Sequence, residues 1–145
     1  PEARWAGVHG SRLMDAAAER RIPVFLGQRI MDGGWRGVFD FMRTFPAATV
    51  IINGVSLWGP DRNIRPLLEN FPGCHVELSE YWVPEGIADL ARLYGAERLL
   101  YGSGYPRFGH GSTMLSIRHS GLPLEQVRLI ASQNLERLLA QAQLV

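Results

Sequence analysis

Short apolar runs alternate with longer amphipathic stretches along the chain. The runs have the length of buried strands and are bounded by Gly, Pro or Asn. They predict strands at residues 24–26, 49–52, 74–79 and 98–101. The strand centres, Phe25, Ile51, Val76 and Leu100, lie roughly 25 residues apart, which is the spacing of βα units in a parallel sheet.

The intervals between these runs carry apolar residues at helical spacing. Helices are expected at 11–21, 35–45, 62–71, 85–94, 112–119, from 123 onward, and at 134–143. The first is expected to bury Leu13 with its neighbours Met14 and Ala17, and the last to bury Leu139 with Leu135 and Leu138. The pattern predicts an α/β protein.

Two helix starts have a sequence signal. Asp61 is placed to cap the third helix and Ser112 to cap the helix that follows the last strand. Pro66 removes a backbone donor inside the third helix, so one interpretation begins the regular helix only at that residue.

Four βα units amount to half of an eight-fold barrel. We expect a single domain over residues 1–145 that is the C-terminal half of a (β/α)8 (TIM-like) barrel with extra C-terminal helices. Half a barrel exposes two strand edges and an apolar sheet face. The chain is therefore expected to need a missing N-terminal half, a homo-oligomeric partner or a flattened sheet, and Pro1 in place of Met suggests that it is a fragment of a longer protein.

The net charge and the composition of the chain argue against several classes of binding partner and site. A net charge of +1 gives no electrostatic case for nucleic acid, and no apolar run is long enough for a membrane span. All 15 residues counted as Lys or Arg are Arg, which excludes a Schiff-base or phosphate-loop lysine. Cys74 is the single cysteine, so no intrachain disulfide forms. We expect a cytoplasmic protein that acts on a small molecule.

The segment 97–106, ERLLYGSGYP, resembles the last barrel strand of the amidohydrolase-related (β/α)8 hydrolases, which usually read GSDYP or GTDFP there. Residues 133–139, QNLERLL, resemble the closing GNAxRLL helix of that family, and 21–26 resembles another of its strands. The resemblance covers the C-terminal half of such a barrel. It implies hydrolysis of an amide, a lactone or a ring C–N or C–O bond, or a decarboxylation.

The resemblance also implies positions for a metal site, and this chain departs from them. In the family, histidines end the fifth and sixth strands and an aspartate ends the eighth. Those positions fall here at Gly27 or Gln28, at Asn53 and at Gly104. Glycine offers no donor atom, and an amide is a weak zinc ligand. A divalent metal such as zinc would need an altered site, so the cofactor stays unknown and no metal ligand is assigned.

The candidate catalytic residues are His110, Glu77 and Ser103. His110 follows the last strand and could be a replacement ligand, a general acid or base, or a solvated loop residue. Glu77 shares a strand face with Ser79 and is either a general acid or base with a raised pKa or half of a buried ion pair with an arginine. Ser103 serves either chemistry or the turn.

The candidate substrate-binding residues are Asn53, Ser79, Tyr105 and Arg107, each near the carboxyl end of a predicted strand. Arg107 is suited to clamping a substrate carboxylate, whereas Tyr105 could also be rim packing. The Gly102-x-Gly104 turn could cradle a phosphate, although a lone pair of glycines is weak evidence.

Two functions of different class remain open. The chain is either a hydrolase with an altered or absent metal site, or a catalytically degenerate barrel that binds a ligand or another subunit.

Overall fold

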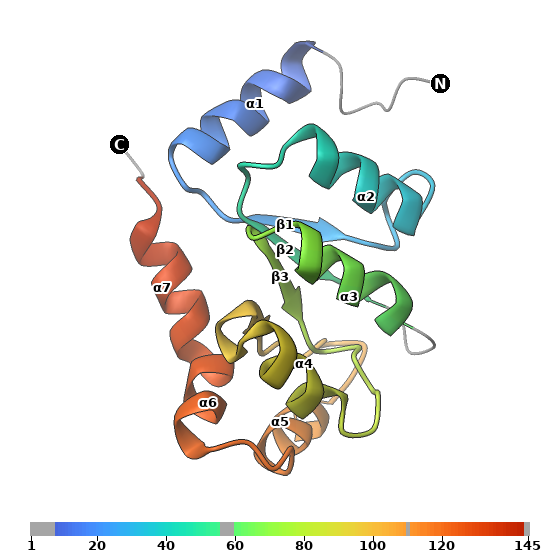
Figure 1. The fold of residues 1–145 in the computed structure, drawn as a ribbon, viewed down its shortest axis with the longest axis vertical. Coiled ribbons are helices and arrows are strands. Elements are labelled where there is room, and N and C mark those ends of the chain that lie inside the picture. Colours follow the sequence, from blue (N-terminus) through green and yellow to red (C-terminus); the bar gives the residue numbers. More distant parts are fainter. Residues whose placement is uncertain (1–7, 56–59, 110, 144–145) are drawn as a thin grey trace.

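The computed structural model describes residues 8–55, 60–109 and 111–143. Its centre is one parallel sheet in the order β1-β2-β3-β4, as Figure 1 shows. The strands are β1 (Val24–Gly27), β2 (Val50–Asn53), β3 (Cys74–Glu77) and β4 (Leu99–Leu100). This confirms the predicted parallel βα units. The last strand is shorter than expected because Ala96–Arg98 forms a 3-10 turn, η2.

The strand register sorts the side chains into two faces. Leu26, Ile52, Val76 and Leu99 are paired in one row across the four strands, and all four are buried in the main core. Successive side chains of a strand point to opposite faces. Phe25, Ile51 and His75 therefore form a row on the other face, which we call the inner face.

Three helices cover the face with the main core (Figure 1). They are α2 (Trp35–Thr44), α3 (Asp61–Asn70) and α4 (Gly86–Tyr94). Their buried positions recur at helical spacing, as predicted: Val38, Phe41 and Met42; Ile64, Leu67 and Leu68; Ile87, Leu90 and Ala91. Helix α1 (Val8–Glu19) precedes β1. The expectation for Leu13 is wrong, because only Met14 and Ala17 of its stripe are buried and Leu13 is 71% exposed.

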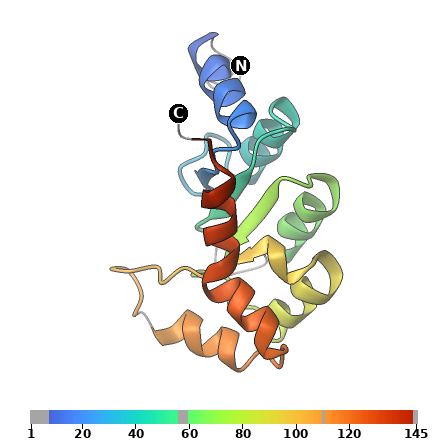
Figure 2. The ribbon, with the colours of Figure 1, turned by 90° about the vertical axis from the view of Figure 1, so that its left-hand side faces the viewer.

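The chain after β4 forms α5 (Gly111–Arg118), α6 (Leu124–Arg128), the π-helical turn η3 (Leu129–Gln133) and α7 (Asn134–Gln141). Helix α7 crosses the face of the sheet opposite α2–α4 (Figures 1 and 2). Its Leu138 packs against Ile51 and Leu100 of the inner face. Leu139 is 54% exposed, so the prediction that it is buried is wrong. The helix thus covers part of the inner face.

The same C-terminal segment closes the outer edge of β4. The Tyr101 amide donates to the Ile130 carbonyl of η3 at 2.8 Å. The Asn134 side-chain amide donates to the carbonyls of Ala96 and Leu99, both at 2.8 Å. Both β1 and β4 are edge strands of the sheet. In the described part of the chain, the C-terminal segment donates to and accepts from the β4 side, whereas no such segment bonds to the outer edge of β1.

The helix starts differ from the sequence expectations. Asp61 is inside the first turn of α3, and its carboxylate accepts hydrogen bonds from Arg65 and from the Tyr81 hydroxyl in place of a capping bond. The helix begins at Asp61 and continues through Pro66, which costs a single backbone bond. Ser112 lies within α5, where its hydroxyl donates to the Gly109 carbonyl. None of the described helices has the length and apolar character of a membrane span.

Candidate functional site

A cleft of about 600 Å³ lies at the carboxyl ends of the strands. Each strand contributes to its wall: Gly27 from β1, Asn53 from β2, Glu77 from β3, and Gly102, just beyond β4. Parallel strands bring their carboxyl ends to one edge of a sheet, which is where ligands bind in α/β barrels. This cleft is the candidate site.

Glu77 is held at the cleft by Ser79. The Ser79 amide donates to Glu77 Oε1 at 2.9 Å, and the Ser79 hydroxyl donates to Oε2 at 2.8 Å. Burial raises the pKa of Glu77, the two bonds from Ser79 lower it in part, and the charge of Glu80 raises it further. Glu77 is thus a half-buried carboxyl group in a fixed orientation with a raised pKa.

Glycine at position 102 makes room for that carboxyl group. A β-carbon on Gly102 would overlap Glu77 Oε1 and would also lie 2.8 Å from its γ-carbon. Because a side chain at this position would displace Glu77, the glycine of the strand-end turn serves the placement of the carboxylate.

Two arginines bind the neighbouring carboxylate, Glu80. Arg29 Nη2 donates to Glu80 Oε2, and Arg107 Nη1 lies 3.4 Å from Oε1. The Glu80 side chain is only 7% exposed, whereas those of Arg29 and Arg107 are 36% and 61% exposed. Sequence reasoning missed Arg29, although its place just after a strand is the signal that singled out the other cleft residues.

The positions of the family's metal ligands do not fit a metal centre here. Gly104 has φ +66, and a β-carbon there would lie 2.7 Å from Phe108 Cδ2 and 3.2 Å from Ser79 Cβ, so an aspartate would require Phe108 to move. Gly27 has no donor atom in a side chain, so only the side-chain amides of Gln28 and Asn53 remain at these positions. The Asn53 Oδ1 is buried without a hydrogen-bond partner among the described residues. The described residues contain no group of three or more His, Cys, Asp or Glu side chains placed to bind a metal.

Most of the predicted site residues meet in the cleft. Asn53, Glu77, Ser79, Tyr105 and Arg107 all line it. Ser103 does not line it, and its hydroxyl accepts the Tyr105 amide at 3.2 Å, as the turn interpretation expects. His110 lies outside the described residues.

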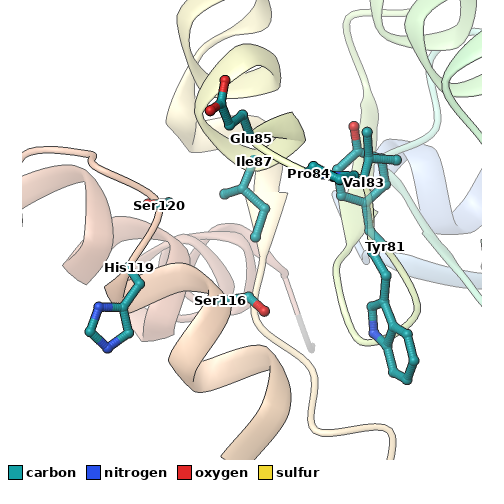
Figure 3. A pocket seen from close by; sticks show the side chains of 9 residues that line it. Tyr81, Val83, Pro84, Glu85, Ile87, Ser116, His119 and Ser120 are labelled. Carbon is teal, nitrogen blue, oxygen red and sulfur yellow. The ribbon is translucent and has the colours of Figure 1, made fainter.

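His75 and His119 lie outside this cleft. His75 is buried in β3 beside the Gly73 carbonyl, and burial lowers its pKa to about 4. His119 lines a second pocket of about 340 Å³ between the loop before α4 and the end of α5, which Figure 3 shows. Tyr81, Ile87 and Ser116 also line this pocket, which contains no carboxylate held as Glu77 is.

One comparison with solved structures is informative. An uncharacterized TIM-barrel protein from Bordetella bronchiseptica aligns with a TM-score of 0.71 and 21% sequence identity, over 93% of this chain and 51% of that chain. This chain therefore has the fold of part of a TIM barrel and spans about half the length of that structure. No protein-family model matches the sequence, and no curated protein does so either.

Proposed function

We propose that this chain carries the catalytic residues of a barrel hydrolase of the amidohydrolase-related type, in which Glu77 is the general base. The observation that carries the proposal is the Glu77 carboxyl group, which lines the cleft with a raised pKa and is oriented by two hydrogen bonds from Ser79. The resemblance of residues 97–106 and 133–139 to that family supports the reaction class.

The chemistry of such a base is simple. Glu77 accepts a proton from water as the water oxygen bonds to the carbonyl carbon of an amide or lactone. The C–N or C–O bond then breaks, and Glu77 returns the proton to the leaving nitrogen or oxygen. A carboxyl group with a raised pKa suits both steps. Nearer to neutral pH both its ionised form, which accepts a proton, and its protonated form, which donates one, are populated, whereas an ordinary glutamate is almost entirely ionised there.

The other cleft residues have supporting roles in this proposal. The Asn53 amide and Tyr105 line the same cleft and bind the substrate, and Ser79 fixes the base. A mechanism through the family's usual metal centre is not part of the proposal, because the ligand positions fall at Gly27 or Gln28, at Asn53 and at Gly104, and none of these residues is a usual zinc ligand.

The test is a hydrolysis screen with para-nitrophenyl esters, dihydrocoumarin as a lactone and para-nitroacetanilide as an amide. Glu77→Gln is expected to lower kcat by about 100-fold or more. Glu125→Gln, on the exposed side of α6, is the matched control and keeps the wild-type rate. Full activity in Glu77→Gln contradicts the proposal. Activity that chelation abolishes and zinc restores replaces it with a metal mechanism.

A second function, in which the chain is a non-catalytic module, is favoured by the open side of the sheet. The outer edge of β1 faces no strand of the described chain, and Phe25 on the inner face is 55% exposed. Unpaired strand edges and apolar faces bind other chains. A second copy is the partner we infer for this surface, because strand β1 can pair with its own copy.

Sedimentation velocity separates this alternative. A dimer that Phe25→Glu dissociates supports it, provided that Leu13→Glu, which changes a more exposed apolar residue on α1, leaves the dimer intact. A wild-type monomer at all protein concentrations contradicts it.

A further inference from the structure

Two arginines from different loops converge on one buried carboxylate in the wall of the cleft. Arg29 follows β1, and Arg107 follows β4 by several residues. They reach opposite oxygens of Glu80, whose side chain is almost fully buried. The buried carboxylate therefore orients both guanidinium groups, while parts of both remain exposed in the cleft.

The charge balance at this point differs from that at other arginines of the chain. Arg65 lies between two carboxylates, Asp61 at 2.8 Å and Asp89 at 3.5 Å. At the cleft there are two arginines to one carboxylate, because the guanidinium groups of Arg29 and Arg107 share Glu80. Each guanidinium carries five N–H donors, so the pair keeps donors for a ligand. The two arginines and Glu80 together carry one excess positive charge, which Glu77 in the same cleft offsets when it is ionised.

Arg98 differs from this pair in having a structural role. Its donors are used on the carbonyls of Cys74 and Phe71 at 2.6 and 2.7 Å, and it does not line the cleft. Arg29 and Arg107 differ from it in facing open space with a charge that is only partly neutralised.

We propose that Arg29 and Arg107, positioned by Glu80, form a subsite for the carboxylate group of the substrate. The forked, planar guanidinium matches a carboxylate in two parallel hydrogen bonds, which a lysine cannot do. The inference rests on the proposed function in taking the cleft as the substrate site. It narrows the substrate to a small organic acid whose amide or lactone bond lies within reach of Glu77.

The test measures binding without turnover. Succinate and benzoate are titrated into the protein by calorimetry and compared with succinamide and benzamide at the same ionic strength. The carboxylates are expected to bind and the amides are not. Arg107→Gln and Arg107→Lys are expected to weaken carboxylate binding about tenfold or more, because the lysine keeps the charge but loses the fork. Arg36→Gln, on the exposed side of α2, is the control that leaves binding unchanged.

Arg107 is the primary variant because its side chain is 61% exposed, so its loss leaves folding intact. Arg29→Gln is the second variant, with its fold checked by melting. The proposal is overturned if the amides bind as tightly as the carboxylates, if no carboxylate binds, or if both arginine variants bind like the wild type.

The subsite and the catalytic proposal fail separately. Glu77→Gln removes turnover but is expected to keep carboxylate binding. Arginine-dependent carboxylate binding in a protein that hydrolyses nothing upholds the subsite and contradicts the base. Hydrolysis that depends on Glu77 but shows no preference for carboxylate-bearing substrates upholds the base and contradicts the subsite.

Discussion

The carboxylate of Glu77 occupies the position that a β-carbon on Gly102 would take. Glu77 is the last residue of β3, and Gly102 lies two residues beyond the adjacent strand β4, whose register pairs Glu77 with Leu100. Because residue 102 has no side chain, there is room beside its α-carbon for the carboxyl group of Glu77, the proposed base.

Gly102→Ala is expected to displace Glu77 from its two hydrogen bonds with Ser79. Overpacking of this kind costs about 1–3 kcal/mol of unfolding free energy, and hydrolysis is expected to fall with it. Urea unfolding and the ester screen measure the two effects. Gly109→Ala is the control, because a β-carbon on Gly109 meets nothing within 4 Å. An alanine at 102 with wild-type stability and rate would contradict the placement of Glu77.

The raised pKa of Glu77 predicts how stability changes with pH. The folded protein holds this proton more tightly than the unfolded chain, whose ordinary value is near 4.5. The contribution of Glu77 is therefore fully present below that value, and it is lost as pH rises through the higher pKa of the folded state. Glu77→Gln does not titrate; its carbonyl oxygen can still accept the Ser79 amide, and its NH2 group can donate to the Ser79 hydroxyl in place of accepting from it. Its stability relative to the wild type should therefore rise between acidic and neutral pH. Denaturant unfolding across that range measures this, and parallel curves for the two proteins would refute it.

The sequence pattern predicted the strands and the main helices because their apolar residues recur with the periods of buried structure. It wrongly predicted that Leu13 and Leu139 are buried. The spacing of apolar residues shows which side of a helix faces the core, but it does not show how many positions on that side the core covers. The Arg29–Glu80–Arg107 cluster was beyond its reach, since the three residues come from loops that only the folded sheet brings together. Asp61 is a different case. A local capping signal was overridden by a tertiary hydrogen bond from Tyr81.

That tertiary bond gives a third prediction. The Tyr81 hydroxyl is buried and donates to Asp61 Oδ1 at 2.6 Å. Tyr81→Phe is expected to lower the unfolding free energy by about 1.5–3 kcal/mol, the range for a hydrogen bond to a charged group. Tyr94→Phe is the matched control, because its bond to Glu69 is exposed at the surface and should contribute little. Equal losses in the two variants would show that burial does not strengthen the Tyr81 bond.

The fourth prediction concerns the bonds that hold α7 to β4. Asn134 is fully buried, and its amide serves the carbonyls of Ala96 and Leu99. Asn134→Ala leaves both carbonyls without that donor and is expected to cost about 2 kcal/mol. Thermal melting should show the loss, whereas Gln133→Ala at the exposed neighbouring position should melt like the wild type. A wild-type melting temperature in Asn134→Ala would mean that the two Asn134 bonds contribute nothing measurable to holding α7.

The closure of β4 by Ile130 and Asn134 has a consequence for assembly. A sheet whose two edge strands are both unpaired can bind one copy of the protein after another and grow into a filament. In the described part of this chain the C-terminal segment bonds to β4, which leaves the β1 edge for the second copy proposed above. In that proposed dimer the two β1 strands would run in opposite directions about a twofold axis. Because the C-terminal segment already bonds to β4, the proposed dimer would offer no second strand edge to a further copy, and sedimentation is expected to show a dimer that does not grow into longer assemblies.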